Sequence, residues 1–316
     1  MSRIAVLGAG AFGTALALVL ARSGREVTLW ARDAEALIAT RTSPRLPGTP
    51  LPPELTLTGD LSRADAQTVL LAVPAQSLGG FLAQNAEALD GRNLVACCKG
   101  IDLTTLSGPS SLIKAACPAA IPALISGPGF AADLAAGLPT AMTLACAHPE
   151  GEALQAQLSG GSLRLYLSPD LTGVELGGAI KNVIAIACGI VIGAGLGESA
   201  RAALLTRGNA EMTRFAMAKG ANAHTLAGLA GLGDLVLTCG SEKSRNFRHG
   251  LAIGRGEATD ASATVEGVAT TFALSRAAKD LGVEMPITET LAAVLNGQMD
   301  VENAMQSLLA RPLKAE

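Results

Sequence analysis

Lys181 stands near the start of a long apolar stretch, residues 173–197, and is the first candidate for chemistry. No charged residue occurs between Asn182 and Gly197, so the pattern predicts a helix that is buried all round. A lysine in such a helix must extend to the surface, find a partner or do chemistry. A membrane span is disfavoured because the uncharged run is shorter than the roughly 20 residues that a bilayer requires. A core helix whose lysine simply reaches the surface stays open as an alternative.

Three glycines in the same stretch, Gly189, Gly193 and Gly197, recur every four residues. They share one face of the predicted helix, where a second backbone can approach closely. We therefore expect this helix to be the spine of a second domain, with Lys181 facing a cleft.

Gly8, Gly10 and Gly13 fit the pattern G-x-G-x-x-G, between a strand predicted at 3–7 and a helix predicted at 14–23. In this context the first glycine permits a tight turn, the second lets the backbone approach a pyrophosphate, and the third lets helix and strand pack closely. The helix N-terminus adds N–H groups and a partial positive charge for phosphates. The sequence therefore predicts a dinucleotide site.

Arg32 and Asp33 follow the second predicted strand, where the residue type helps to select the cofactor. An acid there usually holds the ribose hydroxyls of NAD, whereas an arginine accommodates the 2′-phosphate of NADP. An equally good interpretation of Asp33 is the N-cap of the helix predicted at 34–40. We favour NADP, through Arg32, and leave NAD open.

Further polar residues occur where anions could bind. Lys99 ends a predicted strand, and ligands of doubly wound sheets bind beyond such ends. Residues 231–235 (GLGDL), with Asp234, are expected to interrupt the helical pattern. Arg245 and Asn246 then supply a guanidinium fork and an amide, which are typical phosphate ligands. Solvated side chains on loops are the alternative for these residues.

Strands alternate with helices in the first half of the chain, which predicts a Rossmann-like, doubly wound, mainly parallel sheet. Helical patterns alone follow, so we place a dinucleotide-binding domain at 1–169 and an all-helical domain at 170–316. Residues 42–53, with five prolines, are expected to form an irregular loop. The predicted strands are 3–7, 26–30, 55–58, 68–73, 93–98, 121–126, 141–145 and 163–167. The predicted helices are 14–23, 34–40, 76–89, 110–117, 149–158, 173–197, 198–219, 222–231, 247–253, 265–281, 288–296 and 300–309.

The composition limits the classes of function. A net charge of −3 and 3% aromatic residues argue against nucleic acid as a partner, and three histidines argue against a zinc site. The six cysteines lack metal-ligand spacing and suit reduced, buried thiols, so we expect no metal and a cytoplasmic protein. A strand predicted from Arg3 leaves no room for a signal peptide.

Several longer segments together resemble bacterial-type NAD(P)-dependent glycerol-3-phosphate dehydrogenase over nearly the whole chain. The lysine-asparagine segment, combined with GLGDL and SRN at this spacing, is more specific than the glycine motif, which many dehydrogenases share. The resemblance implies a second domain similar to that of 6-phosphogluconate dehydrogenase. The segments are GAGAFGTALA (8–17), RLPGTPLP (45–52), VPAQ (73–76), CCKGI (97–101), SGPGFA (126–131), ELGGAIKNVIAIACGI (175–190), LLTRGNAEMTRF (204–215), GLAGLGDLVLTCGSEKSRNFRHG (228–250) and VEG (265–267).

The resemblance assigns Lys181 as the catalytic proton donor and acceptor. The implied substrate-binding residues are Lys99, Gly127, Gly129, Lys181, Asp234, Ser244, Arg245 and Asn246. The implied cofactor-binding residues are Gly8, Gly10, Ala11, Phe12, Gly13, Arg32, Arg45, Lys99, Ala131, Arg245 and Glu266. The chain departs from the family pattern at Ala11, Phe12 and Gly129, where serine, tryptophan and serine are common. A side-chain contact from position 129 is therefore excluded, whereas the backbone N–H remains.

The implied reaction is the reversible reduction of dihydroxyacetone phosphate to sn-glycerol 3-phosphate for glycerophospholipid synthesis. Hydride reaches C2 while Lys181 protonates the oxygen. A free lysine, with a pKa near ~10.4, is a poor base, so burial and a second cation are expected to lower it. Whether Lys99 or Asp234 tunes Lys181 is left open, as are the oligomeric state, with a homodimer compatible with the family, and feedback inhibition. The alternatives are a ketopantoate or β-hydroxyacid reductase and a dinucleotide sensor without catalysis.

Overall fold

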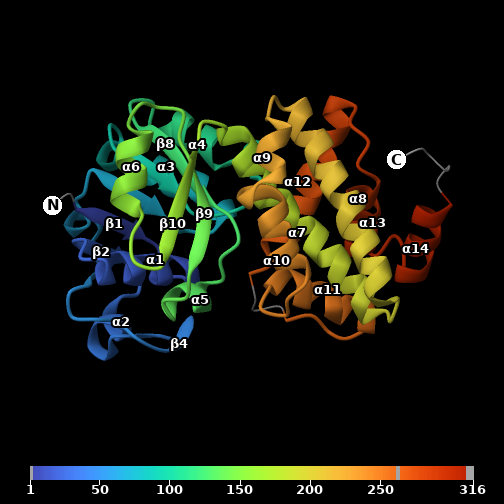
Figure 1. The fold of residues 1–316 in the computed structure, drawn as a ribbon, viewed down its shortest axis with the longest axis horizontal. Helices are drawn as coiled ribbons and strands as arrows, with labels where there is room; N and C mark the ends of the chain where they lie inside the picture. Colours follow the sequence, from blue (N-terminus) through green and yellow to red (C-terminus); the bar gives the residue numbers. More distant parts are fainter. Residues whose placement is uncertain (1–2, 261–263, 311–316) are drawn as a thin grey trace. The chain divides into compact units, whose positions relative to one another are not determined.

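The computed structural model describes residues 3–260 and 264–310 and divides into two compact units (Figure 1). The first unit comprises the chain up to Lys99 together with Ser107–Glu175. The second comprises Gly100–Leu106 and the chain from Leu176 onward. Each unit contains its own cluster of buried apolar residues. Because residues 100–106 belong with the second unit, the chain passes between the units three times, and its last crossing lies at residue 175.

The first unit is built on an eight-stranded sheet with the order β10-β9-β8-β7-β6-β1-β2-β5. All neighbouring strands are parallel except β8 and β9, so the predicted doubly wound, mainly parallel sheet is confirmed. β1, β6 and β7 are buried along their whole length, as expected for strands that helices cover on both faces. The strands are β1 (Ile4–Leu7), β2 (Val27–Trp30), β5 (Thr56–Thr58), β6 (Thr68–Leu71), β7 (Asn93–Ala96), β8 (Ile121–Ser126), β9 (Thr140–Ala145) and β10 (Leu163–Ser168).

Short helices connect these strands. The helix α1 follows the glycine turn, and Arg22 at its end donates to the Ala135 carbonyl of α5 at 2.6 Å. The short α5 was not predicted, because its start is concealed in the glycine-rich segment 126–131. The helices are α1 (Ala11–Arg22), α2 (Glu35–Thr40), α3 (Ala75–Leu89), α4 (Pro109–Ala116), α5 (Ala131–Ala135) and α6 (Gly151–Leu158), with a 3-10 turn, η1 (Leu61–Arg63).

The prediction of an irregular loop at 42–53 is wrong for most of that segment. Residues 42–50 form an antiparallel hairpin from β3 (Thr42–Ser43) and β4 (Leu46–Pro50). Prolines are tolerated here because a two-stranded hairpin consists of edge strands, in which an N–H on one side needs no partner. The buried side chains of Leu46 and Leu51 anchor the hairpin in the core of the first unit.

The second unit is all-helical, as predicted, and α7 supplies much of its core. Asp170 Oδ1 accepts from the Gly173 N–H at 2.8 Å at the start of α7. The helices are α7 (Leu171–Gly193), α8 (Gly197–Ala218), α9 (Ala223–Ala227), α10 (Asp234–Cys239), α11 (Arg245–Arg255), α12 (Glu266–Leu281), α13 (Pro286–Leu295) and α14 (Val301–Leu309), with a π-helical turn, η2 (Leu229–Gly233), between α9 and α10.

The small-residue face of α7 packs against α11. A Cβ atom added at Gly189 would lie 2.1 Å from the Phe247 carbonyl oxygen, and one added at Gly250 of α11 would lie 2.0 Å from that of Ile186. The expectation of close packing is therefore confirmed for Gly189 and, in the same way, for Gly193. It is wrong for Gly197, which has a φ of +87°, begins α8 and has no neighbour in such contact. The predicted single helix over 173–197 thus ends at Gly193.

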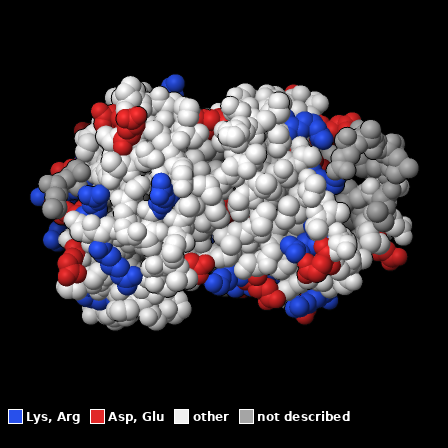
Figure 2. Space-filling model, viewed as in Figure 1, with Lys and Arg blue, Asp and Glu red and all other residues white. Residues whose placement is uncertain are grey.

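α7 is also long and apolar enough to cross a membrane by composition alone, but 78% of its most apolar window is buried inside the structure. Its apolar residues form the core of the second unit, which accounts for the pattern. Much of the face drawn in Figure 2 carries no charged side chain, and charged side chains of both signs gather mainly towards its rim.

Candidate functional site

The glycine turn between β1 and α1 has the geometry of a phosphate-binding loop. Gly8 has a φ of +121°, and an added Cβ would lie 2.6 Å from the Ala72 carbonyl oxygen. At Gly13 an added Cβ would lie 2.7 Å from Cβ of Ala72, so this glycine lets helix and strand pack closely, as predicted. At Gly10, the N-cap of α1, nothing lies within 4 Å of the added atom. The turn is thus tight on its protein side and open at the helix N-terminus, where an anion is favoured.

The residues expected to select the cofactor lie exposed after β2. Arg32 and Asp33 are both exposed, and the N-cap of α2 is Ala34, with no side-chain cap. The interpretation of Asp33 as an N-cap is therefore wrong, because α2 begins one residue later than that role requires. Arg45 is exposed in the turn between β3 and β4. Within the described chain, no hydrogen bond or ion pair engages the side chain of Arg32 or Arg45.

Lys99 lies just beyond β7, and its Nζ donates to the Gly127 carbonyl at 3.2 Å. Gly127 follows β8 and has a φ of +143°, and an added Cβ would lie 3.0 Å from Cα of Met142. At Gly129 an added Cβ would lie 3.1 Å from Thr140 Cγ2, so a serine would require its neighbours to move. This hydrogen bond joins the end of β7 to the loop that follows β8.

The remaining cofactor candidates of the first unit border the same loops. Ala11 begins α1, Ala131 begins α5, and both are partly exposed. Phe12 is partly buried and packs against the core of the first unit.

In the second unit Lys181 is buried and forms an ion pair with a buried acid. Its Nζ lies 2.5 Å from Asp234 Oδ1, and the two side chains are 9% and 2% exposed. The Thr238 hydroxyl accepts from Lys181 Nζ at 2.7 Å and donates to Asp234 Oδ1 at 3.2 Å. The alternative of a lysine that simply reaches the surface is therefore wrong, because a buried charge requires such partners.

The turn η2 positions Asp234. The expectation that residues 231–235 interrupt the helices is wrong. These residues form the end of a π-helical turn that continues into α10. An added Cβ at Gly177 would lie 2.6 Å from the Ala230 carbonyl oxygen, so η2 sits directly on α7. Lys181 lies one helical turn after Gly177 on the same face, so the two elements bring Lys181 and Asp234 together. π-helical turns occur frequently at functional sites.

The segment 244–246 begins α11. Ser244 is its N-cap, and the Ser244 hydroxyl accepts from the Phe247 N–H at 3.2 Å. The amide of Asn246 donates to Asn182 Oδ1 at 2.9 Å and accepts from the Gly267 N–H at 3.0 Å. Arg245 is exposed at the helix N-terminus.

Asn246 therefore links α7, α11 and the start of α12, which begins with the partly exposed Glu266. Sequence reasoning did not identify Thr238 or Asn182 as site residues. Thr238 lies four residues after Asp234, so recognising residues 234–239 as a helix would have placed both on one face.

Cys97 and Cys239 are buried thiols of raised pKa. Burial raises the pKa of the Cys97 thiol to about 12 and raises that of Cys239 as well, so neither supplies a thiolate near neutral pH. In residues 3–260 and 264–310, no group of three or more His, Cys, Asp or Glu side chains is arranged to hold a metal.

The glycine turn fits a dinucleotide on its own geometry. The open backbone at Gly10, the α1 N-terminus and the clearances at Gly8 and Gly13 match the requirements of a pyrophosphate.

Comparison with known families and proteins gives consistent matches. Residues 3–152 match the family model described as NAD-dependent glycerol-3-phosphate dehydrogenase N-terminus, and residues 170–306 match the model for the C-terminus. A relative from Paracoccus denitrificans, named glycerol-3-phosphate dehydrogenase [NAD(P)+], is 59% identical over 99% of both chains. One of the same name from Ruegeria sp. is 57% identical over 99% of both chains.

A solved structure is also similar to this chain in fold. The crystal structure of glycerol-3-phosphate dehydrogenase from Coxiella burnetii has a TM-score of 0.93 and 37% identity. The match covers 98% of this chain and 99% of that chain, so it includes both compact units.

Proposed function

Because the chain belongs to the NAD-dependent glycerol-3-phosphate dehydrogenase family, we propose that Lys181 donates the proton when this enzyme reduces dihydroxyacetone phosphate. The chain is an NAD(P)-dependent oxidoreductase acting on the CH–OH group of sn-glycerol 3-phosphate. The observation that supports the role of Lys181 is its burial beside Asp234 and Thr238.

The surroundings of Lys181 suit proton transfer to a developing alkoxide. The bound nicotinamide cofactor supplies the hydride, and the protein supplies orientation, charge and the proton. The carboxylate of Asp234 attracts the ammonium, and the Thr238 hydroxyl fixes its direction. A buried, oriented ammonium protonates the ketone oxygen as hydride reaches C2, and the same group accepts the proton in the reverse reaction.

The substrate phosphate is proposed to bind at the start of α11. Arg245 carries a guanidinium there, and the helix N-terminus adds partial positive charge. The side chains of Ser244 and Asn246 already form bonds within the unit, so they support this terminus. In the first unit, Lys99 and the backbone of Gly127 and Gly129 are the corresponding candidates for anion binding.

We propose NADP as the preferred cofactor, with NAD as the second choice. Arg32 is exposed after β2, where an arginine accommodates the 2′-phosphate. Asp33 does not cap α2, so it is also available to ribose hydroxyls, which supports use of both cofactors. The proposed cofactor contacts near the glycine turn are Phe12, Arg45 and Ala131 of the first unit, and the family resemblance also implies Arg245 and Glu266 as cofactor contacts.

A cytoplasmic homodimer that serves glycerophospholipid synthesis is proposed from family membership. Light scattering on the purified chain tests the dimer, and cell fractionation tests the location. Growth of a depleted strain with and without added glycerol 3-phosphate tests the pathway.

The decisive experiment measures oxidation of NADH and of NADPH side by side with dihydroxyacetone phosphate, for the wild type and Lys181→Ala. We expect turnover with both cofactors in the wild type, with a lower KM for NADPH, and loss of turnover in the variant with cofactor affinity retained. Substantial turnover by Lys181→Ala would refute the assignment. Activity on ketopantoate instead of the phosphorylated ketone would favour the reductase alternative, and cofactor binding without turnover on either would favour the sensor.

A further inference from the structure

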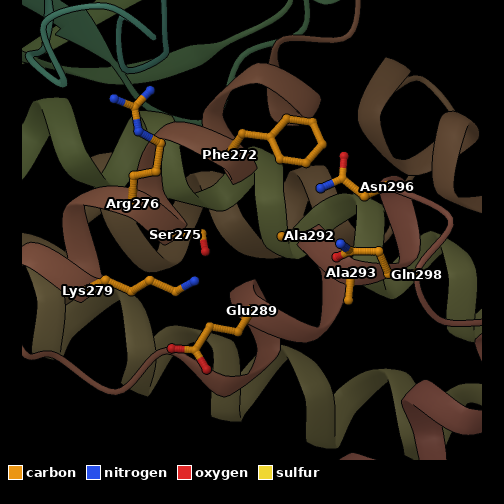
Figure 3. A pocket seen from close by; sticks show the side chains of 9 residues that line it. All are labelled: Phe272, Ser275, Arg276, Lys279, Glu289, Ala292, Ala293, Asn296 and Gln298. Atoms are coloured by element: carbon orange, nitrogen blue, oxygen red, sulfur yellow. The ribbon is translucent and has the colours of Figure 1, made fainter.

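The groove between α12 and α13 in the second unit is bordered by an arginine that binds a backbone carbonyl. Figure 3 shows the guanidinium of Arg276 turned away from Lys279, and its Nη1 donates to the Leu103 carbonyl at 3.1 Å. The two cations therefore do not converge on one anion, and we assign the groove no ligand. An arginine of this kind instead fixes the segment whose carbonyl it binds. A second one, Arg201, lies next to the residues that hold Lys181.

Arg201, on α8, holds the C-terminal end of α10. Its Nη1 donates to the carbonyl of Cys239, the last residue of that helix, at 3.2 Å. An added Cβ at Gly240 would lie 3.3 Å from the same Nη1, so the guanidinium packs directly against the end of α10. The last four carbonyls of a helix have no partner within it, and the helix dipole favours a cation at this end. Arg201 supplies both a donor and a positive charge there.

Glu198 fixes the direction of the Arg201 guanidinium. Its Oε2 accepts from Arg201 Nε at 2.7 Å and lies 2.5 Å from Nη2, while Nη1 is directed at α10. The main chain of Arg201 is held as well, because its carbonyl accepts from Cys188 Sγ of α7 at 3.9 Å. Contacts at both the side chain and the main chain thus orient Arg201 towards α10.

The end of α10 also carries a residue that holds Lys181. Thr238 directly precedes Cys239, and its hydroxyl accepts from Lys181 Nζ at 2.7 Å and donates to Asp234 Oδ1 at 3.2 Å. α10 has only six residues, and the ends of helices fray, so the position of this hydroxyl depends on the order of the last turn. The carbonyl that Arg201 binds belongs to the next residue along the chain.

We propose that Arg201 is a positioning residue for the reaction: by holding the end of α10, it keeps the Thr238 hydroxyl on Lys181 Nζ. The proposal rests on the proposed role of Lys181 in proton transfer and adds a residue that acts through Thr238. The contacts form a closed set, which runs from α7 through α10 to α8 and returns from α8 to α7. The two positions on α7, Lys181 and Cys188, are seven residues apart, which corresponds to about 10 Å along the helix axis.

The test is a double-mutant cycle on kcat for the reduction of dihydroxyacetone phosphate, with Arg201→Met and Thr238→Val measured alone and together. Arg201→Met should lower kcat about three- to tenfold in the wild type and have no further effect in Thr238→Val. The KM for NADPH should not change. Arg255→Met, which removes an exposed arginine from the last turn of α11, is the matched control and should keep the full rate.

Two results would overturn the proposal: an unchanged kcat in Arg201→Met, or the same loss of kcat with and without the Thr238 hydroxyl. Thermal unfolding shows whether Arg201→Met folds. If it does not, Glu198→Ala replaces it, because the Glu198 side chain is 73% exposed whereas that of Arg201 is 24% exposed. Glu198→Ala should lower kcat about twofold, since an exposed ion pair contributes modestly, and an unchanged kcat would then contradict the proposal.

Lys181→Ala, measured in the same assay, separates this proposal from the proposed function. Substantial turnover by Lys181→Ala refutes the role of Lys181 itself. Loss of turnover in Lys181→Ala together with a full rate in Arg201→Met refutes only the role of Arg201.

Discussion

Lys181 and Asp234 form a buried ion pair, and the energetics of this pair favour a functional interpretation. Removing two charges from water costs free energy that their attraction often does not recover, so a buried ion pair is weak evidence for stability. Thr238 bonds to both groups and reduces this cost. An oriented ammonium next to a carboxylate is, by contrast, what proton transfer at a ketone oxygen requires.

We predict that Thr238→Val lowers kcat about tenfold or more, with cofactor affinity unchanged. Valine retains the shape of threonine but loses the hydroxyl, and a hydrogen bond to a charged group contributes about 1.5–3 kcal/mol. Steady-state kinetics with dihydroxyacetone phosphate measure the loss. Thr238→Ser should recover most of the rate, and Thr206→Val, at an exposed position of α8, is the matched control. A full rate in Thr238→Val would mean that the hydroxyl does not orient Lys181.

Arg245→Ala is predicted to raise the KM for dihydroxyacetone phosphate roughly ten- to a hundredfold. The reason is loss of a charge-assisted contact to the phosphate, which contributes about 1.5–3 kcal/mol. Arg248→Ala, three residues later and also exposed, is the control. If the variant changes only the ratio of NADPH to NADH use, Arg245 belongs to the cofactor site alone.

At the residue scale, sequence reasoning identified Lys181 because a single charge in an apolar run is conspicuous. No local pattern encodes the contact of Lys181 with Asp234, 53 residues away, so the pairing was expected only as a hypothesis from the family resemblance, and the structure contains it. The contact of Lys99 with Gly127, across 28 residues, escaped for the same reason. The sequence left open whether Lys99 or Asp234 tunes Lys181. Within the second unit, the carboxylate of Asp234 is in direct contact with Lys181 Nζ.

At the scale of elements, α7 positions the site through one face. Gly177, Lys181 and Gly189 lie on the same ridge, with η2 against the first and α11 against the last. The spacing of the glycines predicted close packing, but it could not name α11 as the partner. The π-helical turn escaped because its glycines are equally typical of a loop. The hairpin at 42–50 escaped because prolines argue against strands in general.

The buried Glu211 of α8 holds the first turn of α13. Its carboxylate accepts from the Ile287 N–H at 2.7 Å and from the Thr288 N–H at 3.3 Å. Burial raises the pKa of Glu211 from its ordinary 4.5 to about 7, while these bonds and the nearby Arg214 oppose the rise. The folded state therefore favours the uncharged carboxyl of Glu211 more than the unfolded state does. Its contribution to stability is complete below pH 4.5 and is lost as the pH rises through 7.

We predict that Glu211→Gln reduces the loss of unfolding free energy between pH 5 and pH 8, by at most about 3 kcal/mol. Glutamine cannot ionise, so the penalty for burying a charge at the higher pH disappears. Urea unfolding at the two pH values, compared between variant and wild type, measures the difference. Glu302→Gln, at an exposed position of α14, should leave it unchanged. Equal pH dependence in Glu211→Gln and the wild type would show that Glu211 is ionised throughout.

The whole molecule has two hydrophobic cores, but no single position in the sequence separates the two units. The sequence predicted a boundary at 169/170, where strand patterns give way to helices. Residues 100–106 pack with the second unit through Ile101 and Leu106, although strands of the first unit flank them on both sides. No change in composition marks such an insertion, so periodicity could not reveal it. The Glu175 carboxylate, at the last crossing, accepts from the Ser110 N–H at 2.7 Å within the first unit.

Separate cores imply that a ligand of one unit stabilises that unit first. NADPH at a concentration of 100 times its Kd should add about 2.7 kcal/mol to the stability of the unit that binds it. We predict that hydrogen exchange slows in β1, α1 and β6 by up to about a hundredfold, with smaller changes in α12 and α13. Lys181→Ala should show the same protection, because the lysine is assigned to the proton and not to the cofactor. Equal protection of both cores would instead mean that the two units open as one.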